Sequence, residues 1–515
     1  MSNLSDDTRP WDIAAARNLY NVHRWGVGYF DINEEGHVVA KPLQESGAVV
    51  DLTDVIEEAK GRGLRFPLLI RFQDIVRHRV EAINQAFRNA IAEYNYRGSY
   101  RGVFPIKVNQ LREVVEEILD AGRPFNFGLE VGSKPELSAG LALQSQVGSL
   151  IICNGYKDAS FIRMALTGLK LGKTVILVVE KLEELRQIIA VSRQVRVEPL
   201  IGIRVRLMSK GGGKWSESAG ENAKFGLNTA EVLEAVELLR AENLAHCFKL
   251  IHFHIGSQVP DILLIKKAVQ EASRYYAKLV KMGFPITYLD VGGGLGVDYD
   301  GSRSAFDSST NYTLQEYTND IVYYIGDVCN AEGVPHPDIV SESGRAIVAY
   351  HSVLIVEVFG AIARTNPNLS VACEANEHPL VKELADIRAN LSRLNKIEAY
   401  HDALERKEIA HHMFTLGLLN LPEGQDRETL LGDQRRGGAQ LQGPAVRPRG
   451  NSKTRGHAGG PVPLQLLGLP VAARPLGAGP VVPDHAHQPA HGAADPRGDA
   501  GGHHLRFGRP GEQVH

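Results

Sequence analysis

The sequence predicts an α/β protein whose main domain is a (β/α)8 barrel of the TIM type. Between residues 103 and 342, short apolar runs alternate with amphipathic stretches of helical spacing. The runs are almost continuously apolar, as in parallel strands that are buried on both faces. There are eight such runs. This number favours a closed barrel over a doubly wound open sheet, which would show the same alternation.

The expected strands and helices follow one another in strict order. The eight strands are predicted at residues 103–107, 127–131, 150–154, 175–179, 201–207, 250–255, 289–293 and 339–342. The helices between them are predicted at residues 111–119, 135–143, 158–169, 182–191, 229–242, 262–282 and 314–330, and a further helix at 75–94 precedes the first strand. Parallel strands need such crossover helices, because a hairpin cannot join them.

Four segments are expected along the chain. Residues 1–72 are predicted to form an N-terminal β segment and residues 73–372 the barrel. Residues 373–430 are rich in Leu, Ala, Glu and Arg, and apolar residues at helical spacing predict a helical insertion. Residues 431–515 differ in composition from all of these.

The last segment lacks the composition of a folded domain. Gly and Pro make up 28 of its 85 residues, and Phe507 is its only aromatic residue. A disordered tail explains this composition. Translation of GC-rich DNA in a shifted reading frame explains it as well, and this is the hypothesis we favour. The DNA sequence around codon 430 decides between the two.

Bulk properties exclude several classes of protein. The net charge of −3 creates no global field that attracts nucleic acid or anionic membranes. The sequence has no run of about 18 apolar residues and no apolar leader, so a cytoplasmic location is expected. The four cysteines are far apart and form no CxxC pair, which indicates reduced core thiols; they are Cys153, Cys247, Cys329 and Cys373.

A lysine stands at the end of the first expected barrel strand. Lys107 follows the apolar run 102–106, and barrel enzymes place their catalytic groups at the C-terminal ends of the strands. Most lysines are merely solvated surface charges. In a buried barrel mouth, however, desolvation would lower the pKa of Lys107, and the neutral amine could form a Schiff base.

Glycines, a carboxylate and an arginine follow later strands. Gly292, Gly293 and Gly294 form either a tight turn or a place where backbone N–H groups approach a phosphate. Glu342 and Arg345 could form a local salt bridge of little energy. Alternatively, Arg345 binds a phosphate and Glu342 keeps a pyridine nitrogen protonated.

Two histidines lie near the end of the sixth expected strand. His252 and His254 are two residues apart, so their side chains are expected on one face of that strand. A metal site formed by the pair is one interpretation, but no third ligand stands at a recognisable spacing. Stacking of His254 on a cofactor ring is the other, with Ser257 as a further hydroxyl donor to a phosphate.

These motifs, in this order and spacing, resemble the fold-type III decarboxylases that depend on pyridoxal 5′-phosphate (PLP) and share their barrel with alanine racemase. The segments that carry the resemblance are 103–109, 253–257, 289–294 and 342–345. Segments 20–30 and 206–215 and the helical insertion are similar to the arginine decarboxylases within that group. The similarity extends from about residue 18 to about residue 429.

The resemblance implies a cofactor, a site and a reaction. PLP would be held by the Schiff-base lysine Lys107, by His254 stacked on its ring, by Ser257, Gly292, Gly293, Gly294 and Arg345 at its phosphate, by Glu342 at its ring nitrogen and by Arg204 near its ring hydroxyl. The reaction would be the decarboxylation of L-arginine to agmatine and CO₂, a step in polyamine and spermidine biosynthesis. Members of the family are also described with magnesium (Mg²⁺) and as homo-oligomers.

The chain departs from the family after the helical insertion. Fold-type III decarboxylases bring a cysteine–aspartate pair and a tyrosine to the site from a C-terminal β-domain. Here no cysteine follows Cys373 and no tyrosine follows Tyr400. We therefore expect weak binding of PLP, slow or absent turnover of arginine, and exposed apolar faces on the N-terminal strands. Another decarboxylase or racemase of this fold, and a non-catalytic PLP-binding protein, remain as alternatives.

Overall fold

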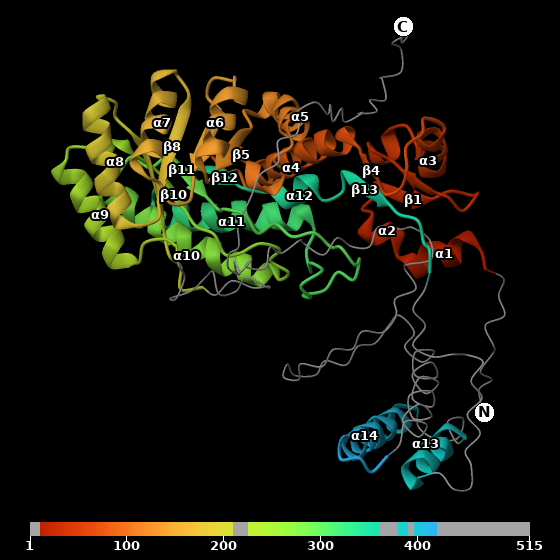
Figure 1. Ribbon diagram of the computed structural model, residues 1–515. Coiled ribbons are helices and arrows are strands. Elements are labelled where there is room, and N and C mark those ends of the chain that lie inside the picture. Colours follow the sequence, from red (N-terminus) through yellow and green to blue (C-terminus); the bar gives the residue numbers. More distant parts are fainter. Residues whose placement is uncertain (1–10, 210–224, 361–377, 390–395, 420–515) are drawn as a thin grey trace, which may run out of the picture. The chain divides into compact units, whose positions relative to one another are not determined.

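The computed structural model describes residues 11–209, 225–360, 378–389 and 396–419 (Figure 1). Its centre is a closed barrel of parallel strands in sequence order, in which the last strand pairs with the first. The barrel strands are β5 (Tyr100–Pro105), β6 (Gly128–Val131), β7 (Leu150–Cys153), β8 (Thr174–Val179), β9 (Leu200–Arg204), β10 (Phe248–His252), β11 (Tyr288–Asp290) and β12 (Asp338–Ser341). The predicted barrel and all eight predicted strands are thereby confirmed.

Helices cover the outside of the barrel (Figure 1). They are α4 (Gln73–Glu93), α5 (Arg112–Gly122), α6 (Lys134–Leu143), α7 (Ala159–Lys170), α8 (Leu182–Val195), α9 (Thr229–Ala241), α10 (Ile262–Lys281) and α11 (Leu314–Glu332), and the short α12 (Gly344–Val348) follows β12. Capping boxes fix the first residues of two of them: Asn228 pairs with Glu231 before α9, and Thr313 pairs with Glu316 before α11.

The apolar strand runs reflect burial on both faces. One cluster of buried side chains consists of Val103, Leu150, Ile152, Ile176, Val178, Leu250 and Val340. The alternate residues of the same strands, such as Ile151 and Leu177, belong to a larger cluster that also contains the inner faces of the helices. The first cluster therefore fills the barrel interior and the second fills the layer between strands and helices.

The N-terminal segment contains helices as well as the expected strands. Its elements are α1 (Ile13–Tyr20), α2 (Val22–Trp25), β1 (Phe30–Ile32), β2 (Val38–Ala40), η1 (Gln44–Ser46), β3 (Val50–Asp51), α3 (Leu52–Gly61) and β4 (Leu68–Arg71). The predicted β segment thus missed the three helices. Asp51 caps α3 by accepting a hydrogen bond from the backbone of Thr53. Leu52, Val55 and Ala59 are the buried face of this helix.

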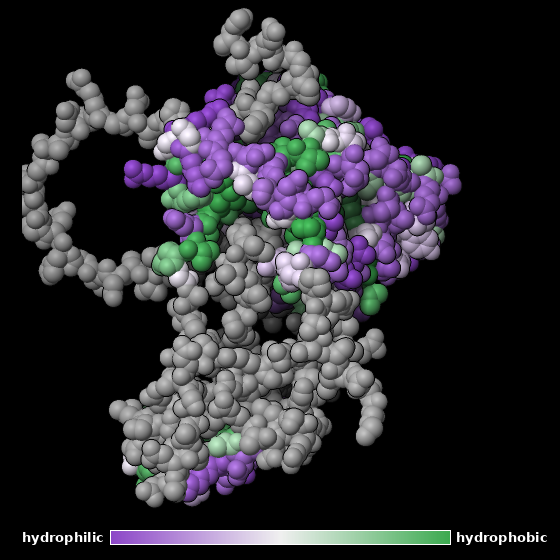
Figure 2. Space-filling view, turned by 90° about the vertical axis from the view of Figure 1, so that its right-hand side faces the viewer, coloured by the Kyte–Doolittle hydropathy of each residue, from purple (hydrophilic) through white to green (hydrophobic). Residues whose placement is uncertain are grey.

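Strand β4 forms a two-stranded antiparallel sheet with β13 (Ser352–Ile355), which follows the barrel in the sequence. This sheet and the irregular segment that follows β13 expose several large apolar side chains, namely Leu69, Leu354, Val356, Val358 and Phe359. Figure 2 looks onto this side of the molecule and shows hydrophobic residues gathered between hydrophilic ones. The expected exposure of apolar side chains on the N-terminal strands is thus present at Leu69.

Two helices lie in the region expected as a helical insertion. They are α13 (Pro379–Ala389) and α14 (Lys396–Thr415). Leu380 and Ala410 are buried against each other's helix, and Arg406 forms an ion pair with Glu383 at 2.9 Å. The tail at residues 431–515 and Cys373 lie outside the described residues. In the described part of the chain, every helix is too short or too polar to cross a bilayer.

Candidate active site

Lys107 lies just beyond the end of the first barrel strand. Strand β5 ends at Pro105, and Lys107 is the middle residue of the 3-10 turn η2 (Ile106–Val108). Its Nζ lies 3.1 Å from the carboxylate of Glu130, which is fully buried on the neighbouring strand β6. The predicted strand 103–107 therefore extended too far, because Ile106 and Lys107 belong to the 3-10 turn that follows β5. Lys107 still lies at the C-terminal end of the barrel.

The pKa of Lys107 differs from the sequence-based expectation. The Lys107 side chain is 53% exposed. Burial of its ammonium group opposes the charged form, but the carboxylates of Glu130 and Glu342 outweigh this effect and raise the pKa above its usual value. The predicted fall in the pKa was wrong, because it did not include these two acids. In the protein as described, Lys107 is a cation held by Glu130.

Three further buried groups surround Glu342, which follows β12. Asn154, after β7, donates hydrogen bonds from Nδ2 to Glu130 at 3.1 Å and to Glu342 at 2.6 Å. His252, the last residue of β10, places Nδ1 3.0 Å from Oδ2 of Asp290 and 3.7 Å from Oε1 of Glu342. The ends of β6, β7, β10, β11 and β12 thus bring one connected polar cluster to the same end of the barrel.

Burial keeps this cluster close to neutral. Desolvation raises the pKa of Glu342 to about 8, and the nearby Asp290 raises it further. Desolvation also raises the pKa of Asp290 to about 7 and lowers the pKa of His252 to about 4. For His254, burial and then the positive charge of Arg204 lower the pKa well below its usual value. Near neutral pH, Glu342 is therefore mostly protonated, Asp290 is partly protonated, and both imidazole rings are uncharged.

The raised pKa values of Asp290 and Glu342 should lower the stability of the cofactor-free protein as pH rises between about 4.5 and about 7, because the unfolded chain has released these protons while the folded chain still holds them. His252 and His254, whose pKa values are lowered, act in the opposite direction in the acidic part of this window, so a variant is needed to isolate the carboxyl groups. Asp290→Asn removes one of these groups, and its side-chain oxygen can still accept the Gly292 N–H. Relative to the unchanged chain, Asp290→Asn should therefore gain melting temperature as pH rises across this window. The exposed Asp307→Asn is the control, and equal slopes in all three proteins would contradict the assignment.

The glycine run forms a loop that packs closely against the segment after β10. Gly292 and Gly294 have φ values of +67° and +113°, which few other residues adopt. A Cβ atom at Gly292 would lie 2.2 Å from the carbonyl oxygen of Phe253, and one at Gly293 would lie 3.0 Å from Nε2 of His254. The loop backbone and the ring of His254 can therefore approach this closely only because glycine has no side chain.

Arg345 reaches the same place from α12. Its two terminal nitrogens donate to the hydroxyl of Ser257 at 3.1 Å and to the hydroxyl of Tyr299 at 2.9 Å. Its Nε atom is buried and has no hydrogen-bond partner. A partly buried guanidinium with an unused N–H, next to a hydroxyl, is a site that an anion such as a phosphate would complete. The geometry fits the phosphate of PLP.

Arg204, the last residue of β9, is held by a second acid. Its guanidinium donates to Oε1 of Glu180 at 3.2 Å, and both side chains are largely buried. The backbone of Gly155 also donates to Glu180, at 3.0 Å. Arg204 thus lies at the C-terminal end of the barrel, close enough to His254 to affect its pKa.

The two histidines that were considered as a metal pair have different surroundings. His252 contacts the acids Asp290 and Glu342, and the ligand atoms of these three residues lie within 4.8 Å of one another. His254 lies beyond the strand end against Gly292 and Gly293. The expectation that they share one strand face was wrong, because β10 ends at His252.

Sequence reasoning missed several residues of the cluster. Glu130, Asn154 and Glu180 had not been singled out. Glu130 left a signal that could have been used: it is the only charged residue in the apolar run 127–131, and a charge inside a buried strand needs a partner. Asn154 and Glu180 follow their strands directly, where polar residues are common and the sequence carries no comparable signal.

Comparison with known proteins identifies the family. Residues 79–349 match the pyridoxal-binding domain of the pyridoxal-dependent decarboxylases, and residues 374–431 match the helical bundle domain of the arginine decarboxylases. The crystal structure of the biosynthetic arginine decarboxylase of Campylobacter jejuni is 33% identical, with a TM-score of 0.63, over 82% of this chain and 68% of that one. The chain belongs to the biosynthetic arginine decarboxylases.

Other biosynthetic arginine decarboxylases are more similar in sequence. The protein of Phocaeicola vulgatus is 48% identical over 414 residues, which are 80% of this chain and 66% of that protein. The protein of Prochlorococcus marinus strain MIT 9313 is 44% identical over 433 residues, which are 83% of this chain and 67% of that protein. The chain thus spans about two thirds of the length of these biosynthetic arginine decarboxylases.

Proposed function

We propose that the chain binds PLP weakly at the C-terminal end of the barrel and catalyses a slow decarboxylation of L-arginine to agmatine and CO₂, with the activity impaired as expected from the sequence. The observation that carries this proposal is that the C-terminal end of the barrel holds the polar cluster around Glu342, the amine of Lys107 and the Arg345–Ser257 pair. Membership of the biosynthetic arginine decarboxylases supports the substrate, which no described side chain specifies on its own.

The residues present fit the cofactor. Arg345 and Ser257 offer donors to the phosphate, and the loop of Gly292, Gly293 and Gly294 leaves room for it. The uncharged ring of His254 lies against this loop and offers a flat surface for a stacked ring. Lys107 offers the amine that would bond to the cofactor aldehyde, and Glu130 fixes its position at 3.1 Å.

Glu342 would act at the ring nitrogen of the cofactor. When bound, PLP supplies a protonated pyridine ring that takes up the electron pair left by the departing carboxylate. Glu342 would face the ring nitrogen and, as a carboxylate, would accept a hydrogen bond from its N–H. Burial raises the pKa of Glu342 to about 8 in the cofactor-free protein, and the positive charge of the bound ring would counteract this effect and favour the ionised form. Asn154 keeps Glu342 in place through a hydrogen bond of 2.6 Å. We propose that Arg204, anchored by Glu180, contacts the ring hydroxyl.

Conversion of radiolabelled arginine by the purified chain tests the function. The chain loaded with PLP should release CO₂ and agmatine in equal amounts from L-arginine, and at least about tenfold less product from L-ornithine or L-lysine. Product from one of the other amino acids, or formation of D-arginine, would support the alternative decarboxylase or racemase instead. Bound PLP without any product would contradict the proposed activity and support a non-catalytic PLP-binding protein.

The remaining expectations also stand as proposals. We propose a homo-oligomer in the cytoplasm, which the family and the free thiols of Cys153, Cys247 and Cys329 support. Mg²⁺ prefers oxygen ligands in octahedral geometry. Both clusters with metal-ligand spacing among the described residues contain a histidine, so neither offers the all-oxygen ligand set that Mg²⁺ prefers.

A further inference from the structure

A second group of possible metal ligands lies at the other end of the barrel. Glu198 stands just before β9, and His246 and Cys247 end the 3-10 turn η5 (Ala245–Cys247) just before β10. Because the barrel strands are parallel, residues that precede a strand lie at the end opposite to Lys107, which follows one. The group is therefore separate from the candidate active site.

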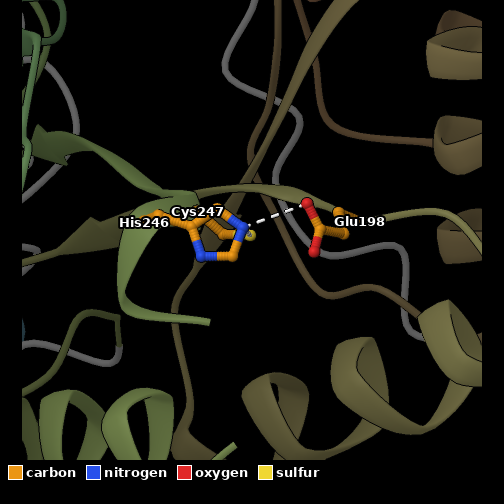
Figure 3. A group of neighbouring side chains, drawn as sticks. All are labelled: Glu198, His246 and Cys247. Carbon is orange, nitrogen blue, oxygen red and sulfur yellow. Dashed lines mark hydrogen bonds and ion pairs between the residues drawn. The ribbon is translucent and has the colours of Figure 1, made fainter. Parts of the chain in front are cut away.

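The three side chains converge on a small volume (Figure 3). Nε2 of His246 lies 3.0 Å from Oε2 of Glu198 and 3.5 Å from Sγ of Cys247. All three ligand atoms lie within 4.8 Å of one another. In tetrahedral zinc sites, metal–ligand bonds of about 2.0–2.3 Å place neighbouring ligand atoms about 3.3–3.6 Å apart. The observed spacing is close to that of such a site without any movement of the backbone.

The backbone holds the ligands in this arrangement. Strands β9 and β10 are hydrogen-bonded neighbours, with Ile201 opposite Phe248, so the residues before them enter the barrel side by side. Cys247 is 2% exposed and packs in the core between strands and helices. The side chains of His246 and Glu198, by contrast, are 57% and 70% exposed. A cation could approach from solvent and meet a sulfur that is already fixed on the inner side.

We propose that Glu198, His246 and Cys247 bind one thiophilic divalent cation of the Zn²⁺ class, with water as the fourth ligand. A thiolate, an imidazole and a carboxylate together form a ligand set that is typical of Zn²⁺, whereas Mg²⁺ prefers oxygen ligands alone. The cation would replace the proton of the Cys247 thiol, which passes to solvent. Bound there, it would link the segments that lead into β9 and β10 and stabilise this end of the barrel. The proposal does not depend on the proposed activity.

Cobalt(II) is the probe that tests the site, because ligation by a thiolate gives a charge-transfer absorption band that histidines and carboxylates alone do not give. The histidines near the C-terminus, such as His503 and His504, therefore cannot imitate the signal. The full chain without an affinity tag is freed of metal by a chelator and titrated with Co²⁺. We expect a thiolate band that saturates at one Co²⁺ per chain and disappears when one equivalent of Zn²⁺ is added.

Variants decide which thiol is responsible. Cys247→Ala should abolish the band, whereas Cys329→Ala, which removes another buried free thiol, should keep it, as should Lys107→Ala. Glu198→Gln changes an exposed side chain and should fold normally. It should weaken Co²⁺ binding by at least about tenfold, since even outer-shell partners of a metal contribute that much.

Absence of the band from the unchanged chain would overturn the proposal. So would a band that persists in Cys247→Ala, because the thiolate would then belong to another cysteine. If Cys247→Ala does not fold, the Glu198→Gln titration decides, and unchanged Co²⁺ affinity in that variant counts against the site. In that case the contacts of Figure 3 are a simple hydrogen-bonded group.

Discussion

Replacement of Lys107 by alanine should abolish the covalent attachment of PLP and reduce agmatine formation by at least about 10³-fold, the scale of loss when a nucleophile is removed. The reason is local. Lys107 provides an amine within hydrogen-bond distance of Glu130, which also accepts a hydrogen bond from Asn154 of the carboxyl cluster. Without this amine PLP can be held only by contacts at its ring and phosphate. Absorption of the bound cofactor and the rate of agmatine formation are the measurements.

Substitution of a second lysine is the control that distinguishes the specific role of Lys107 from the general effect of removing a positive charge. Lys134, at the start of α6, forms an exposed ion pair with Asp158 at 2.7 Å. Its replacement by alanine should leave both PLP absorption and agmatine formation within about twofold of the unchanged chain, because exposed ion pairs contribute little. Equal effects of the two substitutions would mean that Lys107 has no special role.

Replacement of Arg345 by alanine should weaken the binding of PLP by about 10- to 100-fold, because hydrogen bonds to charged groups contribute about 1.5–3 kcal/mol. Arg345 donates to Ser257 and has a buried Nε atom without a partner, so a phosphate would gain from both features. Fluorescence titration of the cofactor-free protein with PLP measures the dissociation constant.

Pyridoxal, which has no phosphate, is the matched control ligand for Arg345. Its dissociation constant should change by less than about twofold in Arg345→Ala, since the guanidinium would have no partner on this ligand. Arg345→Lys should fall between the two proteins, because an ammonium keeps the charge but loses the fork of donors. A similar loss of affinity for PLP and for pyridoxal would show that Arg345 supports the fold and does not bind the phosphate.

The barrel could be predicted because burial of its strands on both faces leaves a pattern that is visible in the sequence. Strands buried on both faces must be apolar along their whole length, as at residues 175–179, and the count of such runs then selects a closed barrel. The N-terminal helices were missed for the opposite reason. Helix α1 is short and α2 spans only four residues, so neither repeats a helical pattern often enough to be recognised.

The candidate site was only partly predictable. Motif order placed Lys107, His254 and Glu342 at strand ends, and the structure brings these ends together. The charge balance could not be predicted, because it depends on pairs far apart in the sequence. The pKa of Lys107 rises through the contact with Glu130, which lies 23 residues away. Glu342 and Arg345 illustrate the same limit: the sequence left open whether they form a local salt bridge or act separately, and the structure shows separate partners, Asn154 for Glu342 and Ser257 for Arg345.

The central claim is that the amine of Lys107 bonds to the aldehyde of PLP at this end of the barrel. Sodium borohydride reduction of the 515-residue protein after incubation with PLP, followed by peptide mass spectrometry, tests it most directly. The account predicts one reduced phosphopyridoxyl group per chain, on Lys107, at PLP concentrations that leave exposed lysines such as Lys134 unmodified. An unmodified Lys107, or labelling spread equally over the exposed lysines, would contradict it.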